Sequence, residues 1–133
     1  MNIIVCIDDG GGILFNKRRQ SSDKALIRRV LEQSVNSRLL MNEYSAKLFE
    51  GENVLVDNFF LSNAKEGDFC FVENEDVTDY LNKIKKVYLY RWNRKYPSDF
   101  KFNMDIIKDF KLISTENFVG NSHPEITEEI YEV

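Results

Sequence analysis

Residues 69–92 read FCFVENEDVTDYLNKIKKVYLYRW, and this stretch decides the expected fold. It opens on the short apolar run 69–72 and closes on the longer run 86–92, and both are rich in the aromatic and β-branched residues that strands favour. Residues 75–84 lie between the two runs and predict a helix. A strand–helix–strand order of this kind is typical of α/β domains.

The N-terminal third follows the same order. Residues 3–7 (IIVCI) form a nearly continuous apolar run, which is typical of a strand buried on both faces. Ser21, Ser22 and Asp23 are N-cap candidates for a helix, and residues 38–41 predict a second strand. The long crossover makes these two strands a parallel pair with a right-handed connection. The apolar face of the helix consists of Leu26, Ile27, Val30 and Leu31.

Two segments near the C-terminus predict an antiparallel pair of strands. They are residues 110–114 and 128–133, and the loop between them contains Gly120 and Pro124. The polar turn 42–45 is expected to open a further helix. We therefore expect residues 1–133 to form a single α/β domain with a mainly parallel central sheet, flanking helices and an antiparallel C-terminal strand pair.

Composition narrows the class of protein. The chain holds 18 Lys and Arg against 22 Asp and Glu, a net charge of −4, which removes the bulk electrostatic case for a non-specific nucleic-acid binder and leaves a local basic patch as the alternative. Cys6 and Cys70 lie in strand-like runs and fit buried reduced thiols better than a disulfide framework or a zinc site. No apolar run approaches the roughly 18–20 residues of a membrane span, and the N-terminus lacks a basic region. We expect a cytoplasmic domain without membrane contact.

The order of elements and several local strings resemble the dihydrofolate reductase-like fold. The first strand with its acidic end, IIVCIDD, and the unit 69–92 are similar to parts of that family's sheet. Residues 96–102 (YPSDFKF) are similar to its D-x-x-F segment, and residues 111–114 and 130–132 to its last two strands. The similarity runs along most of the chain and implies the same fold, although a fold does not by itself give a function.

The positions that bind the cofactor in reductases of that fold differ in this chain. The reductases carry a Gly-Gly pair after the strand that corresponds to residues 69–72. The residues here are Val72, Glu73 and Asn74. The reductases also carry a Gly-Arg-x-Thr segment for the cofactor phosphates. The residues here are Asn42, Glu43 and Ser45, and a glutamate repels phosphate.

On the substrate side, the resemblance rests on one carboxylate. Asp23 matches the carboxylate that protonates a pterin in the reductases, and an alternative register places Leu26 there. The substrate-site Trp of the reductases is absent from residues 17–23, and their segment for the adenosine end is reduced to residues 50–68. We therefore expect the fold without the reductase activity and without NADPH or another cofactor.

The whole chain also resembles a family of small uncharacterised proteins of low-GC Gram-positive bacteria and their phages. Some of its members carry a ribonuclease Z label. A two-zinc hydrolase needs a cluster of His and Asp ligands, and this chain has a single histidine. The sequence therefore predicts no metal site.

The strongest polar cluster follows the first strand. Arg18, Arg19, Gln20 and Ser21 precede Asp23 at a helix N-terminus, where free backbone N–H groups suit an anion such as a phosphate. Ligands of open α/β sheets bind beyond the carboxyl ends of the strands, and the first strand ends at Asp8. The simpler interpretation, which we prefer, is a solvated loop, an N-cap and a strand-end turn.

Two further segments are candidates. His123 is a candidate because a histidine side chain can act as a base near neutral pH, but Ser122 beside it points to the opposite side in an extended chain, so a Ser–His pair is not implied. We prefer a loop turn with a surface histidine. Arg91 and Arg94 flank Trp92 closely enough to clamp a nucleobase or its phosphate, but a core tryptophan with arginines paired to local acids is the simpler interpretation.

These features predict a domain that binds a small anionic molecule, with a nucleotide as the best candidate, and that lacks reductase activity. One alternative is an NADPH-dependent reductase or a hydrolase that uses Asp23 or His123 as its catalytic residue. Another is a protein-interaction or inhibitor module of bacterial or phage origin. The ligand-binding candidates are Asp8, Arg18, Arg19, Gln20, Ser21, Asp23, Asn42, Arg91, Asn121, Ser122 and His123.

Overall fold

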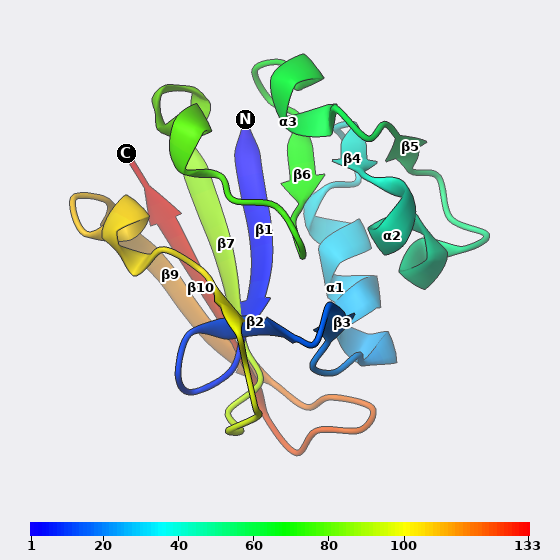
Figure 1. Ribbon diagram of the computed structural model, residues 1–133, viewed down its shortest axis with the longest axis vertical. Coiled ribbons are helices and arrows are strands. Elements are labelled where there is room, and N and C mark those ends of the chain that lie inside the picture. Colours follow the sequence, from blue (N-terminus) through cyan, green and yellow to red (C-terminus); the bar gives the residue numbers. More distant parts are fainter.

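The computed structural model describes residues 1–133 and is built on a seven-stranded sheet (Figure 1). The strand order is β5-β4-β6-β1-β7-β10-β9. The first five strands in that order are mutually parallel, and the last two are antiparallel to their neighbours. The strands are β1 (Asn2–Ile7), β4 (Leu39–Met41), β5 (Leu55–Val56), β6 (Phe69–Phe71), β7 (Lys86–Arg91), β9 (Lys111–Phe118) and β10 (Ile126–Glu132). The expected α/β fold, with a mainly parallel sheet and an antiparallel C-terminal pair, is confirmed.

The first and second predicted strands are parallel but are not neighbours. β6 lies between β1 and β4, because Cys70 is in register with Ile3 on one side and with Leu40 on the other. All three residues of β6 are buried, so this strand needs a partner on each side. The parallel orientation of β1 and β4 was predicted correctly, and their pairing as neighbours was wrong.

Three α-helices flank the sheet. α1 (Lys24–Gln33) begins at the N-cap Asp23, and α2 (Glu43–Ala46) at the N-cap Asn42, as predicted. α3 (Phe60–Asn63) follows β5. Three 3-10 helices complete the set: η1 (Lys47–Phe49), η2 (Thr78–Lys83) and η3 (Met104–Ile107).

The predicted helix over residues 75–84 is wrong, since only η2 forms there. The Asp76 carboxylate accepts hydrogen bonds from both the backbone N–H and the hydroxyl of Thr78, which turns the chain at that point. The backbone N–H of Ile84 then bonds to the carbonyl of Leu81 as the chain enters β7. The six residues of η2 therefore form tight 3-10 turns rather than a longer α-helix.

The sheet is covered on both faces. Ile4 of β1 packs in a cluster with Leu26 and Val30 of α1, whereas Ile3 and Val5 pack on the opposite face. That opposite cluster also holds side chains of α3 and η3. The prediction that the first strand is buried on both faces is confirmed.

A second, three-stranded sheet covers the carboxyl end of β1, where the sequence analysis expected a loop. It consists of β2 (Gly12–Phe15), β3 (Arg18–Arg19) and β8 (Phe100–Lys101). Asn16 and Lys17 both have positive φ, 53° and 63°, so they form the two-residue hairpin turn that joins β2 to β3. A Cβ atom at Gly12 would collide with Ser98, so a glycine is required for this close approach.

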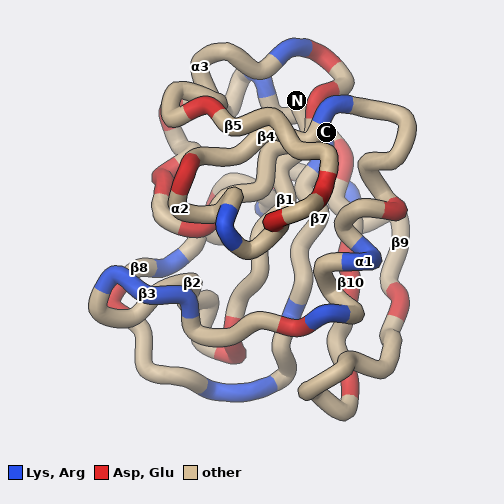
Figure 2. Tube along the Cα trace, turned by 90° about the vertical axis from the view of Figure 1, so that its right-hand side faces the viewer, with Lys and Arg blue, Asp and Glu red and all other residues tan.

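Charges of both signs are interspersed along the trace on the side that faces the viewer in Figure 2. None of the helices has the length and the hydrophobicity that a membrane span requires. The two cysteines are free. Burial raises the pKa of Cys70 to about 12 and also raises the pKa of Cys6, so both favour the thiol form.

Candidate functional site

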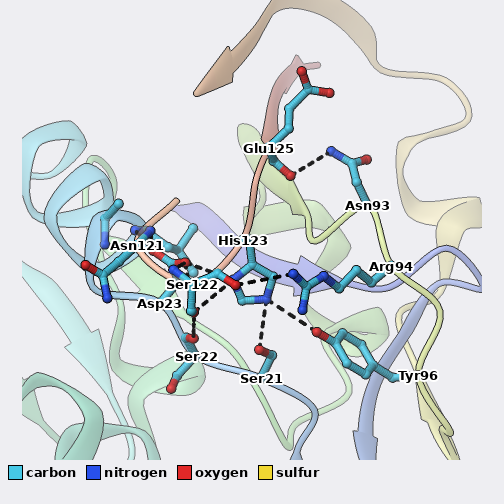
Figure 3. Close-up of polar contacts among 12 residues, drawn as sticks. Ser21, Ser22, Asp23, Asn93, Arg94, Tyr96, Asn121, Ser122, His123 and Glu125 are labelled. Atoms are coloured by element: carbon cyan, nitrogen blue, oxygen red, sulfur yellow. Dashed lines mark hydrogen bonds and ion pairs between the residues drawn. The ribbon is translucent and has the colours of Figure 1, made fainter. Parts of the chain in front are cut away.

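β1 and β7 run side by side and end at the same edge of the sheet (Figure 1). The β2–β3 hairpin, the N-terminus of α1 and the loop between β9 and β10 meet there. Figure 3 shows how they bring Ser21, Asp23 and His123 together with Tyr96 of the β7–β8 loop. Ser21 and Asp23 are about a hundred residues away from His123 in sequence, so only the fold makes them neighbours.

His123 is buried, with 1% of its side chain exposed, so the preferred interpretation of a surface histidine is wrong. The Trp92 ring stacks on the imidazole with a centroid distance of 4.6 Å and an interplanar angle of 26°. Trp92 is itself buried, as the simpler interpretation of the 91–94 segment predicted. Stacking against an aromatic ring in the core fixes the plane of the imidazole.

Asp23 carries more than the N-cap role that its sequence position suggests. Its side chain is fully enclosed, and one carboxylate oxygen lies 2.8 Å from Nδ1 of His123. Burial would raise the pKa of Asp23, but these hydrogen bonds outweigh it and hold the pKa well below its ordinary value. The other donors are the backbone N–H groups of Ala25, Leu26, Asn121 and Ser122 and the hydroxyl of Ser122.

The charge state of Asp23 determines which imidazole nitrogen carries the proton. An ionised carboxylate can only accept, so Nδ1 of His123 carries the proton and donates it to Asp23. In the neutral ring Nε2 is then an acceptor. Two hydroxyls face Nε2, that of Ser21 at 3.0 Å and that of Tyr96 at 3.3 Å. The result is a hydroxyl–imidazole–carboxylate chain that can take a proton from an alcohol.

Gly120 lets the β9–β10 loop reach Asp23. A Cβ atom at this position would lie 2.6 Å from the carboxylate and 2.8 Å from the carbonyl oxygen of His123. The backbone N–H of Gly120 also donates to that carbonyl, which closes the turn. A glycine is therefore required for the close contact between this loop and the start of α1.

A second buried carboxylate, Glu73, lies where the resemblance placed the cofactor. Arg19 binds it through two parallel hydrogen bonds of 2.8 and 3.0 Å, and the hydroxyl of Ser45 donates to it at 2.8 Å. The Arg19 guanidinium also lies 4.7 Å above the centre of the Tyr44 ring. Arg19 is therefore neutralised within the chain and is not a free cation for an anionic ligand.

Asn42 takes part in the same contact between residues 42–45 and residues 73–74. Its side-chain amide donates to Asn74 at 2.7 Å, and its side-chain oxygen accepts from the backbone N–H of Ser45. Residues 42–45 and 73–74 are the two segments expected to face a cofactor, and here they bind each other. The side chains of Asn42, Ser45 and Glu73 thus link the segments that follow β4 and β6.

A small inner cavity separates the Asp23 and Glu73 clusters. Its volume is about 10 Å³, space for about one water molecule. Leu26 faces this cavity and Asp23 does not. Its lining includes Cys6, Ile13, Arg19, Gln20, Ser21, Leu26, Phe71, Glu73 and Trp92.

A larger outer groove lies on the other side of Asp23, between α1 and the residues around η1. Its volume is about 720 Å³. Lys24 and Arg28 of α1 lie along one wall, and Glu50 and Glu52 along the other. The groove also includes Ile27, Leu31, Leu48, Ser22, Asp23, Asn121 and Ser122.

Of the remaining candidates from the sequence, Asp8 and Arg91 are bonded within the chain and Arg18 is not. Asp8 is buried and accepts three backbone N–H bonds, so it closes the strand-end turn that the simpler interpretation expected. Burial would raise the pKa of Asp8, but those three N–H bonds lower it overall. Arg91 pairs with Glu129 at 2.8 Å, again as the simpler interpretation expected. Arg18 is exposed and forms no ion pair.

Both halves of the Asp23 cluster could be named from the sequence, but their contact could not, and neither Tyr96 nor Glu73 was predicted as a site residue. Glu73 was noted only as a departure from the reductases. A single sequence does not show that a Ser-x-Asp string and a histidine about a hundred residues away lie in contact. No group of three His, Cys, Asp or Glu side chains lies close enough together to hold a metal ion.

No protein-family model matches the chain, and no curated protein is similar to it in sequence. Among solved structures, a dihydrofolate reductase from Enterococcus faecalis, complexed with NADP(H) and RAB-propyl, is similar in fold. The TM-score is 0.71 and the sequence identity 12%, over 98% of this chain and 94% of that chain. At this identity the likeness shows the fold alone. The dihydrofolate reductase-like fold expected from the sequence is confirmed.

Proposed function

We propose that this chain is a ligand-binding domain of the dihydrofolate reductase-like fold that binds a nucleoside phosphate in the outer groove and does not use NADPH. The observation that carries this proposal is the composition of the groove. Two cations, Lys24 and Arg28, face two carboxylates, Glu50 and Glu52, across an apolar floor. A molecule with a phosphate, a flat base and a hydroxyl-bearing sugar uses all three kinds of surface.

The phosphate would bind at α1. Lys24 and Arg28 are one helical turn apart on the same face, are exposed and form no ion pair within the chain. The exposed Asn121 lies in the same groove. Each charge-assisted hydrogen bond to a phosphate contributes about 1.5–3 kcal/mol.

The base and the sugar would use the rest of the groove. Ile27, Leu31 and Leu48 offer half-buried apolar surface to a base. Glu50 and Glu52 are acceptors for ribose hydroxyls or for the amino group of a base. The groove volume of about 720 Å³ lies within the roughly 300–1,000 Å³ of ordinary small-molecule sites. The inner cavity, at about 10 Å³, is far too small for any nucleotide.

The absence of NADPH binding is part of the same proposal. Glu73 lies where the resemblance places the nicotinamide-binding glycines, and it is bound by Arg19 and Ser45. We expect these side chains to oppose nicotinamide binding. We expect a Kd for NADPH above about 1 mM, which corresponds to roughly 4 kcal/mol of binding free energy. Calorimetry with NADPH measures it, and micromolar binding would restore the reductase interpretation.

Calorimetry with a panel of nucleoside mono- and triphosphates tests the groove. We expect at least one nucleotide to bind with a micromolar Kd. Changing Lys24 and Arg28 together to glutamine should weaken that binding by about 10²-fold or more, because two charge-assisted bonds are lost. The fold should be unaffected, since both side chains are exposed.

Arg18→Gln is the matched control, because Arg18 is also exposed and unpaired but lies outside the groove. Its nucleotide affinity should equal that of the wild type. A loss of affinity in Arg18→Gln, with no loss in the Lys24 and Arg28 variant, would move the ligand to the arginine loop. Failure of every nucleotide to bind would contradict the proposed function.

A further inference from the structure

We infer that Ser21, His123 and Asp23 form a nucleophilic site for acyl transfer, with ester or activated acyl compounds as its class of substrate. This inference concerns the hydroxyl–imidazole–carboxylate chain and not the outer groove, so it does not depend on nucleotide binding. Ser21 is the nucleophile and His123 is the base. Asp23 is a positioning residue that acts through His123.

The proton on Nδ1 identifies the reactive serine. Ser122 lies 3.2 Å from Nδ1, but that nitrogen already carries a proton, and the Ser122 hydroxyl donates to Asp23. Ser22 makes no side-chain hydrogen bond to the imidazole. Only the Ser21 hydroxyl lies within 3.0 Å of Nε2, the nitrogen with a free lone pair. The adjacent pair Ser122–His123, which the sequence brings to attention, is thus excluded as the nucleophile–base pair.

The base is held rigidly in a productive orientation. Trp92 stacks on the imidazole, and Asp23 fixes Nδ1 at 2.8 Å. Asp23 is itself fixed by the N–H bonds at the start of α1 and in the β9–β10 loop. A carboxylate that stays ionised beside the ring stabilises the imidazolium that forms when Nε2 accepts a proton.

Tyr96 is the donor best placed for the developing oxyanion. Its hydroxyl and that of Ser21 both face Nε2, which has a single lone pair, so only one of them can donate to it at a time. When Ser21 donates, the Tyr96 hydroxyl is free to donate to an oxygen beside Ser21. Ser21 itself is only partly buried and lies at the edge of the inner cavity, so a substrate can approach it from outside.

The reaction balances without a cofactor. Ser21 Oγ forms a bond to the carbonyl carbon while its proton moves to Nε2 of His123, and the ester C–O bond then breaks as the leaving alcohol takes that proton. In the second half a water molecule gives a proton to Nε2 and its hydroxyl to the acyl carbon. The Ser21 oxygen then leaves and takes the proton back.

A fluorophosphonate probe tests the inference on the full chain. We expect one adduct per molecule, and peptide mapping by mass spectrometry should locate it on Ser21. Ser21→Ala should lose the adduct, while Ser22→Ala, the matched control next to it, should react at the wild-type rate. His123→Gln should react about 10²–10⁴-fold more slowly, because the general base is lost.

His123 and Asp23 are buried, so their variants could lose labelling because they unfold. Their test therefore needs a measurement that distinguishes slower chemistry from loss of folded protein. Asp23→Asn should lower the maximal labelling rate by on the order of 10²-fold or more and leave the probe concentration for half-maximal labelling unchanged. Circular dichroism reports whether each variant is folded. Absence of the Ser21 adduct in the wild type, or an equal rate in Ser21→Ala, overturns the inference whatever the variants do.

Discussion

Two buried carboxylates, Glu73 and Asp23, follow the strand ends at the same edge of the sheet and are neutralised in different ways. Glu73 meets the planar guanidinium of Arg19, which carries a full charge and matches the carboxylate through two hydrogen bonds. Asp23 meets no cation of fixed charge. It is held by backbone N–H dipoles and by an imidazole.

This difference determines which of the two carboxylates can take part in proton transfer. An arginine does not lose its proton in a protein, so the pair of Arg19 and Glu73 can only hold two segments together. An imidazole can accept and return a proton, and the chain from Asp23 through His123 ends on a hydroxyl. The Glu73 cluster therefore links the segments that follow β4 and β6, and the Asp23 cluster places a base at the neighbouring edge of the sheet.

The largest expected effect is on stability, from Asp23→Ala. Removing this carboxylate leaves His123 and the N–H groups of the β9–β10 loop without a buried partner, which should cost about 3–5 kcal/mol. Urea unfolding measures the loss. Asp76→Ala is the control, because Asp76 also caps a turn but is exposed, and it should cost about 1 kcal/mol or less. Equal losses would mean that Asp23 is only a cap.

The Glu73 cluster should show a strong pairwise coupling. A double-mutant cycle of Arg19→Ala and Glu73→Ala should give a coupling free energy of about 1.5–3 kcal/mol, the range for hydrogen bonds to charged groups. Urea unfolding of the four proteins measures it. A coupling near zero would show that the two side chains do not hold the segments together.

Acid should remove part of the Asp23 contribution. Its pKa is depressed in the folded state, so its stabilisation is complete above its ordinary pKa of about 4 and is lost as the pH falls towards the folded-state pKa. The stability difference between the wild type and Asp23→Asn should therefore shrink by on the order of 1 kcal/mol between pH 7 and pH 3. Urea unfolding at both pH values checks the sign, and a difference that grows in acid would contradict it.

Arg18→Ala should have the smallest effect, below about 0.5 kcal/mol, because its side chain is exposed and unpaired. Thermal unfolding of Arg18→Ala and of Arg19→Ala compares the stability that each of the two residues of β3 contributes. A destabilisation of Arg18→Ala as large as that of Arg19→Ala would mean that the ion pair with Glu73 is not what stabilises the hairpin.

Much of the fold could be predicted from the sequence. The apolar runs of β1, β6 and β7 are short, continuous and bounded by polar turns, so their burial on both faces follows from composition. The order in which the strands pair could not be predicted. The position of β6 between β1 and β4 depends on contacts between segments that are far apart in the chain. The hairpin turn at Asn16 and Lys17 was missed, since neither residue is the glycine that usually marks a positive φ.

The sequence by itself determined which residues form the buried strands, that Asp23 begins a helix, and that the cofactor motifs of the reductases are absent. These properties depend on neighbours within a few positions along the chain, which periodicity and capping rules describe. Only the tertiary structure decided that Glu73 is paired with Arg19 and that Asp23 is joined to His123 and Ser21. Such contacts join residues 54 to 102 positions apart, and they exist because parallel strands deliver their carboxyl ends, and the loops that follow, to one edge of the sheet.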